Sequence, residues 1–158
     1  MSGIIADNIG LNSGSIVAAT VSGGKINQIE QATYTTAETT TSSTYTASGG
    51  LSDSITPSLT SSKVLITMSL CCGDAVQLAL SAIYRDIGGA GYSAVSSDWR
   101  SFETNVTPFG TMSYIMFLDS PNTTSACTYK HYFKASSGTA GFQKNSGTST
   151  ITLMEILA

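Results

Sequence analysis

The sequence has 158 residues, which suits one domain with its own hydrophobic core and leaves no room for a second full domain. Seven basic and ten acidic residues give a net charge of −3, and so few cations argue against nucleic-acid binding and electrostatic membrane binding. The hydrophobic content of 41% is too high for intrinsic disorder, so 25 serines and 22 threonines are expected to cover much of a folded surface.

The first 24 residues form a separate tract whose spacing fits neither a helix nor one strand. Its apolar residues are scattered among Gly, Asn and Ser, and they include Ile4, Ile5, Ile9 and Leu11. The tract is either a frayed terminus or an arm that becomes ordered on another subunit. The isoleucines favour the arm, because a freely solvated tail has no use for apolar side chains. We therefore divide the chain into an arm at residues 1–24 and a knob at residues 25–158.

The knob alternates apolar and polar residues with period two, which predicts an all-β protein. Residues 28–46 are expected to give one or two strands, and a turn at Gly49–Gly50 is expected to precede a strand at Leu51–Ile55. The run KVLITMSLCC, at Lys63–Cys72, is almost continuously apolar and predicts a strand buried on both faces.

The second half of the knob continues the same pattern. Gly73–Asp74 predicts a hairpin turn into a strand at Ala75–Asp86. Further strands are expected at Trp99–Asn105, Met112–Asp119, Cys127–Ala135 and Thr150–Leu157, with a short one near Phe142. About eight strands separated by turns predict a jelly-roll-like antiparallel β-sandwich.

The strand at Met112–Asp119, MSYIMFLD, has large apolar residues on both faces. One face of a strand in a lone sandwich packs on the core, so the other needs a second surface to be buried against. The candidate residues for the core or for an interface are Met112, Tyr114, Met116 and Phe117.

No catalytic or metal centre is predicted. The only histidine, His131, lies within a strand, and no G-x-S-x-G elbow is present. The carboxylates are scattered singly, and one histidine with three cysteines lacks zinc-ligand spacing. A calcium site near Asp74 or Asp98 stays open. We expect no enzyme activity and no cofactor, with a polysaccharide hydrolase as a minor alternative.

Targeting signals and cysteines indicate a chain made in a reducing cytoplasm. No basic region precedes the first apolar run, and no apolar stretch approaches the about 18 residues of a membrane helix. We therefore expect no membrane insertion. Cys71, Cys72 and Cys127 are expected to be small core residues rather than disulfide partners.

One segment, Gly88–Phe102, combines aromatic residues, a guanidinium and several glycines. Tyr92, Trp99 and Arg100 make it a candidate glycan patch, because aromatic faces beside polar groups suit sugars. The alternative is that Trp99 and Phe102 simply fill the core.

Three blocks of the knob and the opening of the arm carry a recognisable pattern. They are LSDSITPSLTSSKVLITMSL at Leu51–Leu70, FLDSPNTTSACTYK at Phe117–Lys130, STITLMEI at Ser149–Ile156 and ADNIGLNSGSI at Ala6–Ile16. In these blocks the chain resembles small virion proteins of tailed bacteriophages, especially phages of cyanobacteria and marine bacteria. Proteins of that group are tail-fibre or head-decoration proteins, and their domains look like trimeric jelly rolls of the C1q/TNF type.

The resemblance implies a non-enzymatic virion protein that assembles as a homotrimer. Its arm would bind phage capsid or tail proteins, and its knob would point outward from the virion surface after synthesis in the host bacterial cytoplasm. Capsid decoration is favoured over a short fibre, because 158 residues leave no room for a long shaft. The alternative is a tail-fibre receptor-binding module that recognises host surface glycans through its loops.

Overall fold

The structure is a computed structural model that describes residues 9–10, 15–16, 24–73, 77–96, 98–104, 111–143 and 147–157. Within these residues every regular element is a β-strand. The same residues include no helix with the length and apolar character needed to span a membrane.

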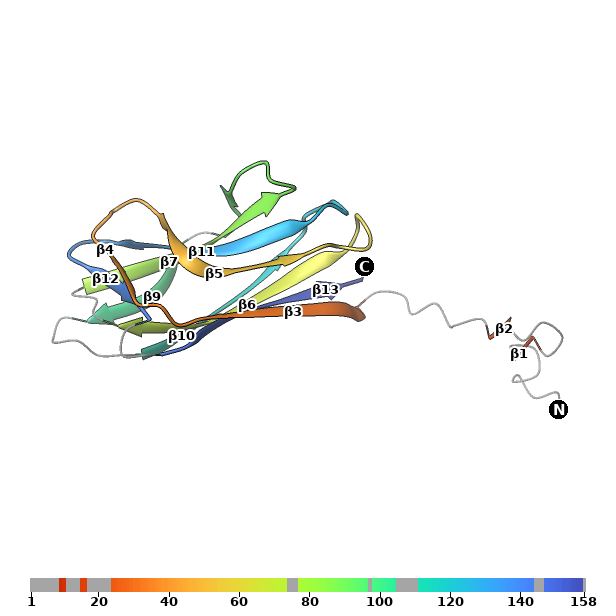
Figure 1. The fold of residues 1–158 in the computed structure, drawn as a ribbon, viewed down its shortest axis with the longest axis horizontal. Coiled ribbons are helices and arrows are strands. Elements are labelled where there is room, and N and C mark those ends of the chain that lie inside the picture. The colour runs from red at the N-terminus through yellow and green to blue at the C-terminus, as the bar shows by residue number, and fades with distance from the viewer. Residues whose placement is uncertain are drawn as a thin grey trace.

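The long strands form two antiparallel sheets that pack face to face (Figure 1). The first sheet, the lower layer in Figure 1, has the order β3 (Ile26–Tyr34), β13 (Ser149–Ile156), β6 (Lys63–Gly73) and β10 (Thr111–Asp119). In the same sheet the short strand β12 (Ala140–Phe142) pairs with Cys72 and Gly73 of β6, and β4 (Glu38–Thr40) pairs with β12. The second sheet has the order β5 (Thr46–Ile55), β11 (Cys127–Ala135) and β7 (Gln77–Ile87), and both β8 (Ser93–Ala94) and β9 (Trp99–Thr104) pair with β7.

The connectivity is that of a jelly roll. Counted along the chain, the eight described strands of six residues or more take the order 1-8-3-6 in one sheet and 2-7-4-5 in the other. Every described pair is antiparallel, and the chain changes sheet at each long connection except that from β7 to β9. The predicted class, an all-β jelly-roll sandwich, is confirmed.

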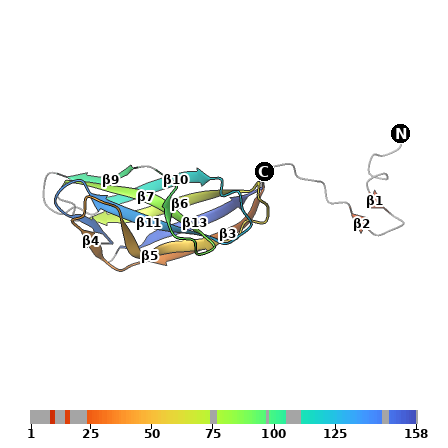
Figure 2. The same cartoon turned by 90° about the horizontal axis from the view of Figure 1, so that it is seen from above.

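The two layers meet along both long edges of the sandwich. Figure 2 shows β9 and β10 together along one edge and β3 and β5 along the other. Each of these pairs brings together strands of different sheets that contact one another. The core lies between the layers, and its largest fully buried apolar side chains are Leu51, Ile55, Ile66, Met68, Leu70, Ile83, Ile115, Tyr129, Phe142, Ile151 and Leu153.

The run at Lys63–Cys72 is buried on its inner face as predicted, but only half-buried on its outer face. Val64, Ile66 and Met68 point into the core, whereas Leu65 and Thr67 between them stay partly exposed. The difference arises because no second layer packs on the outer face of this sheet among the described residues. Of the cysteines, Cys72 and Cys127 are buried and Cys71 is half-buried on the outer face, and no disulfide joins any of the three.

Two predictions of local structure are wrong. The hairpin predicted between β6 and β7 is not formed, because β6 pairs with β13 and β10 while β7 pairs with β11 and β9 in the opposite sheet. Asp74 itself lies outside the described residues. Gly49–Gly50 lies inside β5, where the register against β11 shifts. A Cβ atom at Gly50 would overlap the ring of Tyr34, so the glycine permits close packing rather than a turn.

The arm can be followed only in part. Of the predicted anchoring residues, Ile4, Ile5 and Leu11 lie outside the described residues. Ile9 belongs to the two-residue strand β1 (Ile9–Gly10), which pairs antiparallel with β2 (Ser15–Ile16). The sandwich begins at Gly24, whose N–H donates to the carbonyl of Leu157 at 2.6 Å.

Candidate functional site: two opposite faces of the sandwich

The outer face of the first sheet exposes the large apolar side chains of β10. The exposed fraction is 45% for Met112, 74% for Tyr114, 66% for Met116 and 47% for Leu118. These four side chains share one face because they alternate along the strand, and the intervening Ile115 is buried in the core. A strand that exposes four such neighbours carries a candidate interaction surface.

The register of the first sheet extends this apolar surface across four strands. Leu118 lies opposite Leu65 of β6, Leu65 opposite Met154 of β13, and Met154 opposite Ile29 of β3. Ile29 is itself 56% exposed. Beside this row a shallow groove of about 360 Å³ runs between β10 and β13, and it is lined by Thr67, Met68, Ser69, Tyr114, Ile115, Met116 and Thr150. We call this surface the β10 face.

The sequence-predicted interface residues divide between the two sides of β10. Met112, Tyr114 and Met116 lie together on the β10 face. Phe117 is half-buried and packs against the core. The alternation of the sequence therefore separates Met112, Tyr114 and Met116 from Phe117, as the structure does. It could not place Leu65, Met154 and Ile29 beside them, since the register between distant strands decides that.

The outer face of the second sheet carries a row of four tyrosines. Tyr84 of β7 stacks on Tyr132 of β11 with ring centroids 3.8 Å apart. Tyr45 follows Tyr84 at 6.1 Å, and Tyr92 follows Tyr132 at 6.0 Å. Tyr92 is 38% exposed and the other three rings are half-buried. We call this surface the tyrosine face.

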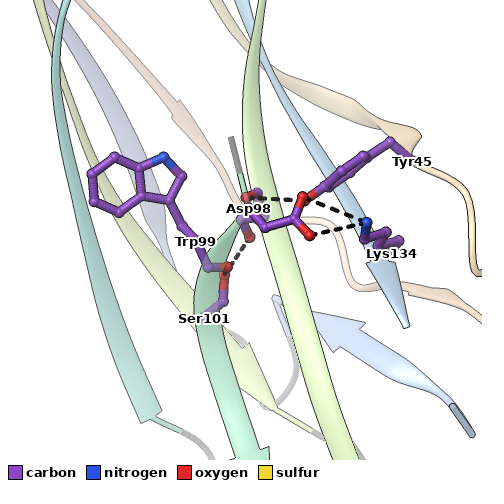
Figure 3. A network of polar contacts seen from close by, with 6 residues as sticks. Tyr45, Asp98, Trp99, Ser101 and Lys134 are labelled. Atoms are coloured by element: carbon purple, nitrogen blue, oxygen red, sulfur yellow. Dashed lines mark hydrogen bonds and ion pairs between the residues drawn. The ribbon is translucent and has the colours of Figure 1, made fainter. Parts of the chain in front are cut away.

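Two lysines of β11 lie at the two ends of this row. The ammonium of Lys134 lies 4.3 Å from the ring centroid of Tyr45, and that of Lys130 lies 5.9 Å from the ring of Tyr92. Lys134 also forms a 3.2 Å ion pair with Asp98, which accepts a 2.6 Å hydrogen bond from Tyr45 (Figure 3). That bond and the Lys134 hydrogen bond lower the pKa of Asp98.

The structure separates the residues of the predicted glycan patch. Tyr92 joins the tyrosine face, and Arg100 is exposed on β9. Trp99 is half-buried against the core, and its indole points away from Tyr45 and Lys134 in Figure 3. The side chain of Phe102 lies outside the described residues. The sequence did not indicate Tyr45, Tyr84 and Tyr132 as site residues. They come from three distant segments, and no local motif joins them.

His131 has a serine partner, but the surroundings of this pair differ from those of a catalytic triad. Its Nε2 lies 2.9 Å from Oγ of Ser81, which accepts a hydrogen bond from Ser101. Both His131 and Ser81 are buried, and Nδ1 of His131 has no carboxylate or other partner among the described residues. Burial lowers the pKa of His131 to about 3 and keeps the ring neutral. Burial keeps this pair away from solvent, and no carboxylate among the described residues orients the ring as a triad requires.

Metal binding finds no support among the described residues. They contain no group of three or more His, Cys, Asp or Glu side chains placed to hold an ion. Asp98, one of the two calcium candidates, is engaged by Tyr45 and Lys134. Asp74, the other candidate, lies outside the described part of the chain.

A buried carboxylate, Glu155, links the two sequence blocks at Leu51–Leu70 and Ser149–Ile156. Its Oε1 accepts hydrogen bonds from the Ser58 N–H at 2.6 Å and from the Ser62 hydroxyl at 2.7 Å. Its Oε2 accepts from Asn27 at 2.9 Å and from Gln28 at 2.8 Å. Burial would raise the pKa of Glu155, but the hydrogen bonds, led by that from Asn27, outweigh it and lower the pKa to about 2. The hydrogen bonds of Glu155 therefore join the two blocks, and the residues involved have a structural role.

The fold and its two outer faces define a jelly-roll domain with one apolar and one tyrosine-rich surface. No family model matches the chain, and no curated protein matches it. Among solved structures it is similar to VP2 of infectious bursal disease virus. With the VP2 subviral particle the identity is 14% and the TM-score 0.38, over 84% of this chain and 38% of that one. With a mutant VP2 from T=1 particles the values are 10% and 0.41, over 82% and 36%. The chain thus spans less than half the length of these VP2 chains.

Proposed function

We propose that this chain is a non-enzymatic structural protein of a virus particle that assembles as a homotrimer through the β10 face. The observation that carries the proposal is the exposure of Met112, Tyr114, Met116 and Leu118 on one strand of a complete sandwich. Aromatic residues and Met are enriched at the cores of protein interfaces, and charged residues are depleted there. Neither the β10 row nor its neighbours Leu65, Met154 and Ile29 carries a charge.

Self-assembly explains this face better than binding to a different protein. A symmetric oligomer buries the same surface on every copy, so the stabilisation from each buried apolar side chain is repeated at every interface. Fully burying one large apolar side chain stabilises the assembly by about 1.5–3 kcal/mol. Such an interface needs no ion pairs, which suits a chain with only seven basic residues. The number three comes from the resemblance of the sequence blocks to trimeric phage proteins.

Within this role, capsid decoration is the form that we favour over a short fibre. The sandwich occupies most of the given sequence, from Ile26 to Ile156, and the arm at residues 1–24 is our candidate for the attachment. Copy number in purified particles separates the two forms. A decoration protein is expected to approach the major capsid protein in abundance, whereas a fibre protein is expected to be scarce.

The oligomeric state of the purified chain tests the proposal directly. We expect native mass measurement at micromolar concentration to give three times the chain mass of 16.4 kDa. Met116→Lys should yield folded monomers, because the side chain is already 66% exposed in the single chain and only the assembly would bury it.

A matched control places the same charge elsewhere. Ala47→Lys alters an exposed residue of β5 in the opposite sheet, and it should leave the trimer intact. A wild-type chain that stays monomeric and soluble would contradict the proposal, as would a Met116→Lys variant that still assembles like the wild type.

A further inference from the structure

We propose that the tyrosine face is a binding site for a neutral glycan. The juxtaposition behind this inference is the row Tyr45, Tyr84, Tyr132 and Tyr92 together with Lys130, Lys134, Asp86 and Asp98 on one side of one sheet. The row differs from the patch expected from the sequence, since it contains Tyr92 but not Trp99. The inference does not depend on how many copies of the chain assemble.

The row offers both surfaces that a sugar ring needs. A pyranose has apolar C–H patches, which pack against aromatic rings, and hydroxyls, which need hydrogen-bond partners. In the described part of the chain the hydroxyls of Tyr84, Tyr92 and Tyr132 make no hydrogen bond with another residue, and none of them is fully buried. They can therefore donate to and accept from a ligand.

The local charge favours a neutral ligand over an acidic one. Lys134 is held by Asp98 at 3.2 Å, so its charge is compensated within the site. Asp86 lies on the strand next to Lys130 and accepts a 2.9 Å hydrogen bond from the Gly91 N–H. The two cations and two anions of this set carry no net charge, so the set itself exerts no net positive potential on carboxylates or sulfates. Charged side chains in such a balanced set serve as hydrogen-bond partners for sugar hydroxyls.

The β7–β8 connection lies at the Tyr92 end of the row. It rises from the upper layer in Figure 1, drawn in green, and leads into Tyr92. Gly88, Gly89 and Gly91 all have positive φ, and an added Cβ at each would meet nothing within 4 Å. The turn therefore stands clear of the sandwich and positions the most exposed ring of the row against solvent.

The tyrosine face also lies on the opposite side of the sandwich from the β10 face. The two faces belong to different sheets, and the core separates them. Copies of the chain that cover the β10 face would leave the tyrosine face pointing outward. A glycan on a cell surface could then bind without competing with assembly.

Titration of the full chain with soluble oligosaccharides tests this site. The probes are neutral gluco-, manno- and galacto-oligosaccharides and, for comparison, oligouronates, with calorimetry as the readout. We expect at least one neutral series to bind. Tyr92→Ala should weaken that binding at least tenfold, because it removes an exposed ring, and Tyr92→Phe should retain most of it. Tyr132→Ala should abolish binding, and a thermal unfolding curve will show that each variant is folded.

The control substitution is Leu59→Ala, which removes a 48% exposed side chain from a loop that belongs to neither face. It should leave affinity unchanged. The inference is overturned if no neutral series binds at millimolar concentration, if oligouronates bind better, or if Tyr92→Ala binds like the wild type. Soluble oligosaccharides report on one chain at a time, so a failed trimer test would not alter this result.

Discussion

At the scale of single residues, Glu155 shows how a carboxylate becomes structural. Its two oxygens accept hydrogen bonds from Ser58, Ser62, Asn27 and Gln28, and no cation pairs with it among the described residues. The ionised form is favoured because every partner is a donor. The carboxylate thus fastens the connection between β5 and β6 to β13 and β3.

We predict that Glu155→Gln lowers the free energy of unfolding by about 2–3 kcal/mol, because a buried charged acceptor is replaced by an amide whose NH₂ faces donors. Urea unfolding measures the change. Glu30→Gln, at an exposed position of β3, is the matched control and should change stability by less than about 0.5 kcal/mol. Equal stabilities of the two variants would show that the hydrogen bonds to Glu155 contribute little.

The lowered pKa of Glu155 gives this contribution a pH dependence. The folded-state pKa is about 2 and the unfolded value is 4.5, so the stabilisation is complete above about pH 4.5 and is lost as the pH falls towards 2. The difference in stability between wild type and Glu155→Gln should therefore shrink over that window. A difference that stays constant from pH 6 to pH 3 would contradict the assignment.

At the scale of elements, the strand β5 depends on a close approach between Gly50 and Tyr34. The ring of Tyr34 lies where a Cβ of residue 50 would be, and it stacks on Phe142 at 6.2 Å. Gly50→Ala should therefore destabilise the sandwich by about 1–3 kcal/mol through overpacking. In a double-mutant cycle, Tyr34→Ala should remove most of that penalty, and additive losses would show that the two residues do not conflict.

The same strand illustrates what the sequence can and cannot predict. Alternation within β11 and β13 is a local property, so their inward and outward faces follow from the letters alone. The two glycines of β5 carry a turn signal that is equally local, yet the partner strand β11 and the distant Tyr34 keep the chain extended there. The hairpin expected after β6 fails for a related reason, because sheet membership is decided by packing over the whole core.

At the scale of the whole molecule, the same difference between local sequence signals and long-range strand pairing applies to the two outer faces. The exposed side of β10 was predictable, since one strand carries it. The tyrosine face was not, because Tyr45, Tyr84, Tyr92 and Tyr132 meet only when β7 and β11 pair. Under the two proposals, these faces on opposite sides of one sandwich would let a single small domain make two separate contacts.

The division into arm and knob yields the last prediction. The sandwich closes on itself at Gly24 and Lys25, which exchange backbone hydrogen bonds with Leu157 at 2.6 and 3.0 Å. Deleting residues 1–20 spares these bonds and every strand of both sheets. We therefore expect the truncated chain to keep the unfolding temperature and native mass of the full chain, while it no longer incorporates into particles. Loss of folding would show that the segment belongs to the core, and normal incorporation would show that the knob alone makes the attachment.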